Sequence, residues 1–207
     1  MKIENLTKYF GDTPVLEHLT LEFRDGRITA VMGSSGCGKT TMFHIMMGIL
    51  KADEGSVEDF IGKKISAVFQ ENRLMEFLTA AENIMAVQRI PDEKKVLNQI
   101  LTQILPEEAL GKKVSEYSGG MKRRAAIARA MLAESDLIIM DEPFTGLDEK
   151  TREQVMEFIQ KYRKGRTMIF STHQEAEAEL LHADRMVLTA VGDRSEKSES
   201  ILASPKA

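Results

Sequence analysis

The sequence predicts an α/β fold with a mainly parallel sheet, an antiparallel β subdomain near the N-terminus and an α-helical subdomain inserted in the core. Three observations support this prediction. Beyond residue 28, apolar strand-like runs alternate with helix-like segments, as around a parallel sheet. The run 137–140 is apolar at every position, which is typical of a strand covered on both faces. A glycine-rich turn at 33–40 joins a strand pattern to a helix pattern, and the 207 residues suit one domain spanning 1–207.

The first thirty residues predict the antiparallel part. Apolar and polar residues alternate over 2–6 and over 19–23, which indicates two short strands. Residues 10–14 contain Gly and Pro and predict a loop. Asp25-Gly26 is a dipeptide typical of a hairpin turn.

The glycine-rich turn reads Gly-Ser-Ser-Gly-Cys-Gly-Lys-Thr over 33–40, which is the spacing of a phosphate-binding P-loop. A β-prone run at 28–32 precedes it, and a helix-compatible run at 41–47 follows. Glycines let the backbone approach an anion, and a helix N-terminus adds N–H groups and a partial positive charge. The alternative is a chance glycine turn before a helix, which this strand–turn–helix context disfavours.

The sequence therefore predicts a P-loop NTPase core. Lys39 is placed to reach the β- and γ-phosphates of a nucleotide, and the Thr40 hydroxyl is placed to bind Mg2+. The predicted nucleotide contacts of this segment are Gly33, Ser34, Ser35, Gly36, Cys37, Gly38, Lys39, Thr40 and Thr41.

Residues from 71 to 133 predict the inserted helical subdomain, which follows a strand at 65–69. A capping-box pattern, Thr79-Ala80-Ala81-Glu82, opens one helix. Apolar residues at helical spacing over 96–105 predict a second helix, and an Ala- and Arg-rich stretch predicts a third over 121–133.

The remaining chain returns to strand and helix alternation. Asp148 can cap a helix that runs to about residue 164, with Gly165 as its stop. Strands are predicted at 167–170 and 186–188, with a helix at 176–181 between them.

Two acidic residues directly follow the apolar run 137–140. In α/β sheets, ligands bind at the carboxyl ends of the strands. Asp141 suits a Mg2+ partner near Thr40, and Glu142 suits a general base that polarises a water molecule. Pro143 disfavours a helical backbone at Glu142. A polar strand end is the plain alternative, and the preceding P-loop favours the catalytic interpretation.

A second candidate anion site lies at Ser118-Gly119-Gly120, which opens a predicted helix. An ordinary N-cap at Ser118 is the alternative. A chain with one P-loop has no obvious need for a second phosphate site. The two sites make sense if they belong to different copies of the chain. His173 and Gln70 each follow a strand. His173 could hydrogen-bond a γ-phosphate, although a lone His is more often structural or solvated.

Composition limits the partners. The net charge is −4, from 28 Lys and Arg against 32 Asp and Glu, which gives no support for a nucleic-acid-binding surface. The single cysteine, Cys37, excludes a disulfide framework and predicts a reducing compartment. No apolar run has the length of a membrane span, so a membrane role requires a partner that supplies the spans.

The motifs together resemble the ATP-binding cassette (ABC) family, specifically the nucleotide-binding subunit of a transporter, over about residues 2–190. Their order carries the resemblance: 33–40, Gln70, 118–120, Asp141-Glu142, Gly146-Leu147-Asp148 and His173. Met121, with the segment 69–74, resembles the nitrate/sulfonate/taurine importer branch. Tyr117 and Met121 depart from the usual Leu-Ser-Gly-Gly-Gln signature.

The resemblance implies a role for each motif. Phe10 would stack on the adenine of ATP, with Tyr9 as the adjacent alternative. The implied catalytic residues are Lys39, Gln70, Glu142 and His173, and the implied Mg2+ residues are Thr40, Gln70 and Asp141. Nucleotide held by the opposite copy of a head-to-tail dimer would meet Ser118, Gly119, Gly120 and Asp148.

The resemblance also implies partners and a place in the cell. ATP hydrolysis would power solute transport through transmembrane permease subunits, with a solute-binding protein as a further component, at the cytoplasmic face of the membrane. A soluble ABC-type switch in translation or DNA repair is the first alternative, but the chain has neither a second cassette nor a long coiled coil. A P-loop kinase is the second, but it would give 118–120 and His173 no role.

Overall fold

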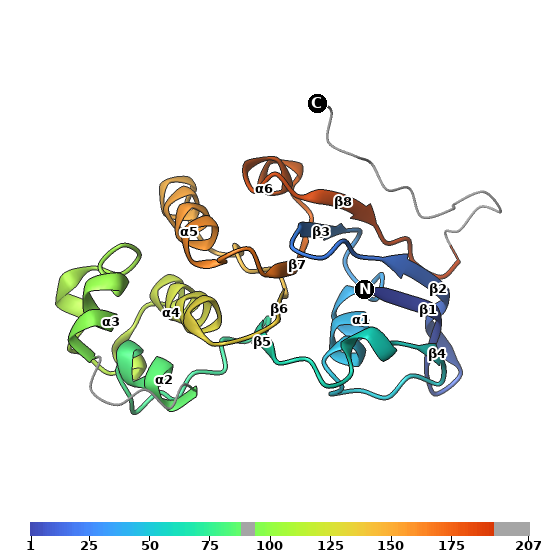
Figure 1. The fold of residues 1–207 in the computed structure, drawn as a ribbon, viewed down its shortest axis with the longest axis horizontal. Coiled ribbons are helices and arrows are strands. Elements are labelled where there is room, and N and C mark those ends of the chain that lie inside the picture. Colours follow the sequence, from blue (N-terminus) through green and yellow to red (C-terminus); the bar gives the residue numbers. More distant parts are fainter. Residues whose placement is uncertain (88–93, 193–207) are drawn as a thin grey trace.

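The computed structural model describes residues 1–87 and 94–192. Residues 88–93, which belong to the predicted helical subdomain, and residues 193–207 lie outside the described part. The predicted α/β fold is confirmed: a five-stranded parallel sheet lies between an α/β layer on one side and a group of helices on the other (Figure 1).

The central sheet has the strand order β5-β6-β7-β3-β8, and every neighbouring pair is parallel. Its strands are β3 (Ile28–Met32), β5 (Ile65–Val68), β6 (Leu137–Met140), β7 (Thr167–Thr172) and β8 (Asp184–Val187). The predicted strands therefore lie within two residues of the observed ones. All of β6 and β7 is buried, as expected for strands covered on both faces.

A second sheet, with the order β2-β1-β4, is antiparallel. It contains β1 (Lys2–Phe10), β2 (Thr13–Glu22) and β4 (Glu54–Ser56). The loop predicted at 10–14 is in fact a two-residue turn at Gly11-Asp12, because both strands continue beyond the predicted ends. The hairpin turn predicted at Asp25-Gly26 is wrong, since the strands on either side of it belong to different sheets.

Apolar side chains form one cluster on each face of the parallel sheet. Alternation along β6 divides them: Leu137 and Ile139 join the cluster beneath α1 (Lys39–Met46), whereas Ile138 and Met140 join the cluster beneath α4 (Gly119–Leu132) and α5 (Glu149–Tyr162). The sheet is thus the shared wall of two cores. The antiparallel sheet covers the α1 side (Figure 1).

The helical subdomain lies at the end of the molecule away from the antiparallel sheet (Figure 1). It contains α2 (Ala80–Val87), α3 (Lys94–Leu101), α4 and the short 3-10 helices η2 (Glu107–Ala109) and η3 (Val114–Glu116); η1 (Glu58–Phe60) lies beside the antiparallel sheet. No strand interrupts its described residues. Leu97 and Leu101 are buried as predicted, but Val96 is 49% exposed and lies off the apolar face.

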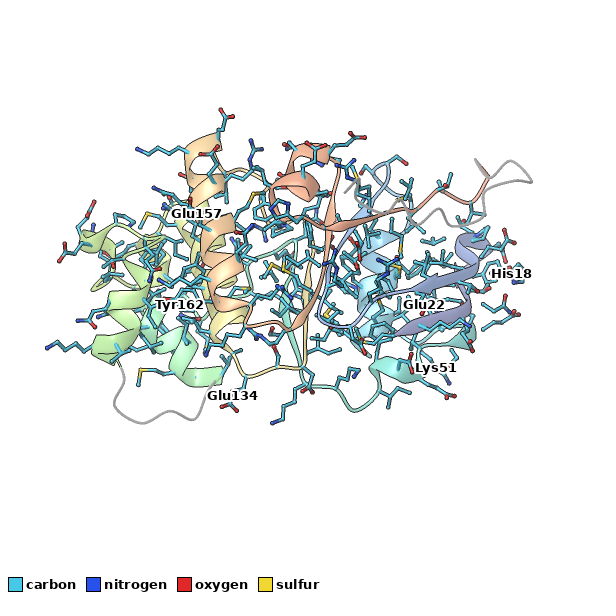
Figure 2. The ribbon with its side chains drawn as sticks, turned by 45° about the horizontal axis from the view of Figure 1, so that its top comes forward. His18, Glu22, Lys51, Glu134, Glu157 and Tyr162 are labelled. Atoms are coloured by element: carbon cyan, nitrogen blue, oxygen red, sulfur yellow. The ribbon has the colours of Figure 1, made fainter. Side chains whose placement is uncertain are left out.

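Helix caps fix two element boundaries. The capping box before α2 is confirmed, because the Thr79 N–H donates to Glu82 Oε2 (2.9 Å) and the Glu82 N–H donates to Thr79 Oγ1 (3.2 Å). Asp148 caps α5 by accepting from the Thr151 N–H (2.9 Å). Tyr162, near the end of α5, faces the helical subdomain (Figure 2). There Gln103 Nε2 donates to the Tyr162 hydroxyl (2.9 Å).

Helix α6 (Glu175–Leu180) connects β7 to β8. Among the helices of the described residues, none combines the length and the apolar character that crossing a membrane requires.

Candidate functional site

The P-loop forms a cradle that only glycine can line at two positions. A Cβ at Gly33 would lie 2.3 Å from the Leu188 carbonyl oxygen, and one at Gly38 would lie 2.6 Å from Leu16 Cδ2. Gly38 has a φ of +102° and stands as the N-cap of α1 without a side-chain cap. The N–H groups of the first turn of α1 are therefore available to an anionic ligand.

Lys39 already faces the loop. Its ammonium donates to the carbonyl oxygens of Gly33 (2.7 Å) and Ser34 (2.9 Å), and the residue is only 7% exposed. The cation is thereby held over the turn rather than in solvent. A phosphate in the cradle would meet a positive charge that the loop itself positions.

Thr40 and Asp141 meet although 101 residues separate them. Helix α1 follows β3, which pairs with β7, and β7 pairs with β6, so the ends of these strands meet at one sheet edge. The Thr40 hydroxyl donates to Asp141 Oδ2 (2.6 Å). The Ser171 hydroxyl donates to Asp141 Oδ1 (2.5 Å), and the Glu142 N–H donates to the Ser171 oxygen (2.8 Å).

Ser171 is the site residue that the sequence reasoning missed. It is fully buried and binds both Asp141 and the backbone of Glu142. The available signal was a hydroxyl residue at the carboxyl end of an apolar strand, two positions before His173. Its function follows from strand pairing, which the local pattern does not specify.

Glu142 lies at the end of β6 as predicted, half-buried beside Thr145, whose hydroxyl donates to its carboxylate (3.3 Å). Its φ is +46°, a left-handed conformation that is uncommon for residues other than Gly, Asn and Asp. Pro143 accounts only for the absence of a right-handed helix. The left-handed backbone is a feature that the sequence does not reveal.

Gln70 is exposed just beyond β5, and within the described residues no hydrogen bond joins its side chain to Thr40 or Asp141. Its backbone is held by a second residue that sequence reasoning missed. The Arg123 guanidinium, on α4, donates to the carbonyl oxygens of Phe69 (2.6 Å) and Gln70 (2.9 Å). Burial lowers the pKa of Arg123, and the carboxylates of Asp141 and Glu142 oppose that shift. Arg123 therefore joins the helical subdomain to the core.

The signature turn, defined here as Ser118-Gly119-Gly120, lies apart from the P-loop. Ser118 is the N-cap of α4 and accepts from the Met121 N–H (3.2 Å), so the cap interpretation holds in geometry. Ser118 and Gly119 are exposed. The preceding residue, Tyr117, is buried, and its hydroxyl donates to the Ala109 carbonyl (2.9 Å), which anchors the turn. Burial also raises the pKa of Tyr117.

Three further predicted residues are exposed. His173 lies on the turn after β7, and Asp148 lies just before α5. Phe10 is 52% exposed at the end of β1, next to the tip of the β1–β2 hairpin. Val15 of that hairpin adjoins Gly38, so the tip lies beside the P-loop.

The residues present fit a nucleotide with Mg2+. The Thr40 hydroxyl and the Asp141 carboxylate are oxygen ligands of the kind that Mg2+ prefers. Residues 1–87 and 94–192 contain no group of three or more His, Cys, Asp or Glu that could enclose a metal ion. A site of two protein oxygens suits a cation that takes its other ligands from phosphate and water.

Comparisons with known proteins agree with this geometry. A family model described as "ABC transporter" matches residues 16–145. The aliphatic sulfonates import ATP-binding protein SsuB 1 of Paracoccus denitrificans is 34% identical, over 92% of this chain and 79% of that protein. The spermidine/putrescine import ATP-binding protein PotA of Thermotoga maritima is 33% identical over 93% of this chain, which spans 56% of that relative's length.

A solved structure shares the fold. The dimeric post-hydrolysis state of the ATP-binding cassette MJ0796, bound to ADP and Pi, is 27% identical, with a TM-score of 0.78 over 96% of this chain and 97% of that one. The predicted resemblance is thereby confirmed. This chain belongs to the ABC transporter family.

Proposed function

We propose that this chain is the ATP-binding and ATP-hydrolysing subunit of an ABC transporter. The observation that carries the proposal is the hydrogen-bonded series Thr40–Asp141–Ser171–Glu142 at the mouth of the P-loop. It brings a Mg2+-type oxygen pair and the Glu142 carboxylate to the end of the sheet that also carries the phosphate cradle. Relatives named as import ATP-binding proteins support the same function.

The residues would act mainly by positioning and charge stabilisation. Lys39 and the first amides of α1 would hold the β- and γ-phosphates. Thr40 and Asp141 would hold Mg2+, which would neutralise phosphate charge. Glu142 would accept a proton from the attacking water as general base, with its backbone fixed by Ser171. Gln70 follows β5 and His173 follows β7, the two strands that flank β6, and both residues would face the γ-phosphate side.

A second copy of the chain would complete the site. The signature turn exposes Ser118 and Gly119 at the start of a 14-residue helix, where N–H groups favour an anion. Within the described part of one chain, no hydrogen bond joins these groups to the P-loop. In a head-to-tail dimer each signature turn would meet the nucleotide of the other copy, and the dimeric MJ0796 cassette supports such an assembly.

A membrane subunit would dock on a groove of about 520 Å³ between the core and the helical subdomain. Ile49 and Val87 line it and are 53% and 52% exposed. Arg73 stacks over Phe69 (3.9 Å to the ring centre) in the same wall. Arg123 binds the Phe69 carbonyl, so movement in the groove would reach α4 and its signature turn. This groove, which combines apolar side chains with the charged side chains of Arg73 and Arg129, suits a short amphipathic helix from a permease at the cytoplasmic face of a membrane.

The test is phosphate release from ATP by the purified chain, with and without EDTA. We expect Mg2+-dependent release that Lys39→Ala abolishes and that Lys51→Ala, at an exposed position away from the cradle, leaves unchanged. Transfer of the phosphoryl group to a small acceptor instead of water would favour a kinase. Co-purification with ribosomes or DNA rather than an integral membrane protein would favour the soluble switch.

A further inference from the structure

A buried ion pair lies behind the turn that carries His173. The Glu177 side chain, on α6, is 5% exposed, and its carboxylate lies 3.7 Å from the guanidinium of Arg152 on α5. The Thr172 hydroxyl donates to the other carboxylate oxygen (2.5 Å). A buried carboxylate is costly unless it is paired and hydrogen-bonded, so this pair is a built feature of the fold.

The same guanidinium reaches the His173 turn itself. Arg152 donates to the side-chain oxygen of Gln174 (2.8 Å), and the Gln174 N–H donates to the Thr172 hydroxyl (3.0 Å). The residues on both sides of His173 are thus tied to one buried network. Burial raises the pKa of Glu177, while the bond from Thr172 and the charges of Arg152 and His173 oppose that shift.

Arg152 also belongs to the first turn of α5. Its N–H donates to the Asp148 carbonyl (2.8 Å), and Asp148 caps the helix through Thr151. The backbone between the exposed Asp148 and Arg152 is therefore held by helix geometry. Among residues 1–87 and 94–192, the buried Nε of Arg152 has no hydrogen-bond partner, so the guanidinium is oriented toward Glu177 and Gln174 while its Nε–H stays unpaired.

We propose that Arg152 and Glu177 are positioning residues that link the Asp148 segment to the His173 turn. This inference rests on the proposed function, in which His173 faces the γ-phosphate, and on the head-to-tail dimer, in which Asp148 meets the nucleotide of the other copy. Engagement of a partner at Asp148 shifts the first turn of α5, and Arg152 carries that shift to the turn bearing His173. The imidazole is then aligned only when the dimer has formed.

The test is a double-mutant cycle on ATP hydrolysis with Glu177→Gln, Arg152→Gln and the combined variant. We expect kcat to fall between about 10-fold and 100-fold in each single variant, with KM for ATP within about threefold of wild type. The combined variant loses no more than the worse single one, because the two residues act as one unit. The matched control is Glu179→Gln on the same helix. The Glu179 side chain pairs with Arg185 at 2.8 Å and is 63% exposed. We expect this variant to keep the wild-type kcat.

Unchanged kcat, additive losses, or losses of kcat and nucleotide binding together would overturn the inference. If Glu177→Gln or Arg152→Gln unfolds at the assay temperature, Gln174→Met on the half-exposed turn replaces it in the test. We expect kcat of this variant to fall by about threefold or more. A wild-type kcat in Gln174→Met would overturn the link. Wild-type protein without hydrolysis would overturn the proposed function as well. Wild-type hydrolysis with unaffected variants would overturn only the link.

Discussion

The two candidate phosphate-binding segments are held in opposite ways. Around the P-loop, Lys39 is 7% exposed, and Thr40, Asp141 and Ser171 bond to one another across three elements. The signature turn is exposed, and its Ser118 bond stays within its own helix. The first segment is held by bonds within the protomer, whereas the second is exposed to solvent at the start of its helix. The contrast indicates that one half of the site is a pocket and the other half is an interface.

The largest effect should come from the carboxylate on the P-loop half. Glu142→Gln removes the general base but keeps the shape of the side chain, so we expect kcat to fall by about 100-fold to 10,000-fold. ATP binding stays, and an ATP-dependent dimer accumulates in size-exclusion chromatography. Glu149→Gln, in the exposed first turn of α5, is the matched control. A wild-type hydrolysis rate in the Glu142 variant would refute the base assignment.

The next effect separates pocket from interface. Ser118→Arg places a bulky cation on the outward-facing turn, and we expect hydrolysis to fall by at least about 100-fold because the second half of the anion site is lost. Nucleotide binding by the monomer, measured by calorimetry, stays at the wild-type affinity. Ser115→Arg, at an exposed position three residues earlier, should change neither quantity. Equal loss of binding and hydrolysis in the Ser118 variant would mean that one chain forms the whole site.

Ser171→Ala tests whether the pocket half is held by its buried hydroxyl. The change leaves Asp141 Oδ1 and the Glu142 N–H without their partner, so we expect the free energy of unfolding to fall by about 1–3 kcal/mol. Urea denaturation measures this loss. Thr102→Ala removes an exposed hydroxyl with a local bond and should cost less than about 0.5 kcal/mol. Equal costs for the two variants would show that Ser171 is only a polar filler.

The smallest effect concerns the subdomain that carries the signature turn. Lys94 and the Thr79 N–H lower the pKa of Glu82 to about 2, below the ordinary glutamate value of 4.5. A carboxylate with a lowered folded-state pKa stabilises the fold above about pH 4.5 and loses that contribution as the pH falls toward 2. Glu82→Gln should therefore lower the free energy of unfolding by about 0.5 kcal/mol near neutral pH, because the pair with Lys94 is partly exposed.

Urea denaturation at a series of pH values measures this difference. The gap between wild type and Glu82→Gln should close on acidification from about pH 5 to 2. Glu108→Gln, in the 3-10 helix η2, provides a control outside the capping box. A gap that stays constant with pH would show that the carboxylate charge of Glu82 does not stabilise the box.

Local patterns predicted most of the fold. The Thr79 capping box, the Asp148 cap and the ends of the parallel strands depend on residues within a few positions of one another, and the structure confirms the two caps and places the strand ends within two residues of the prediction. The two strands of the first hairpin extend beyond their predicted bounds. The wrong hairpin at Asp25-Gly26 has a different origin, since a turn dipeptide does not specify whether the next strand pairs with the last. Val96 was predicted to lie on the apolar face of its helix but is exposed. Its spacing from the neighbouring apolar residues fits more than one helix face.

In the candidate site, too, local features could be predicted from the sequence and long-range contacts could not. Sequence motifs identified the residues that carry the chemistry, but no motif identified the residues that hold them in place. Ser171 bonds to Asp141 across 30 positions, and Arg123 bonds to Phe69 across 54. Such contacts depend on the strand order and on the placement of α4 over the core. A Ser in a strand or an Arg in a helix carries no local sign of them.

Glu142 also has a consequence for how this protein would respond to selection. Its φ of +46° is a conformation that Gly adopts freely and a non-Gly residue adopts at a cost of order 1 kcal/mol. A library screened for heat resistance alone should therefore enrich glycine at this position. The enriched variants would fold well and lack the carboxylate. Thermal tolerance and turnover thus oppose each other at this backbone position, and a useful screen for this chain must score both.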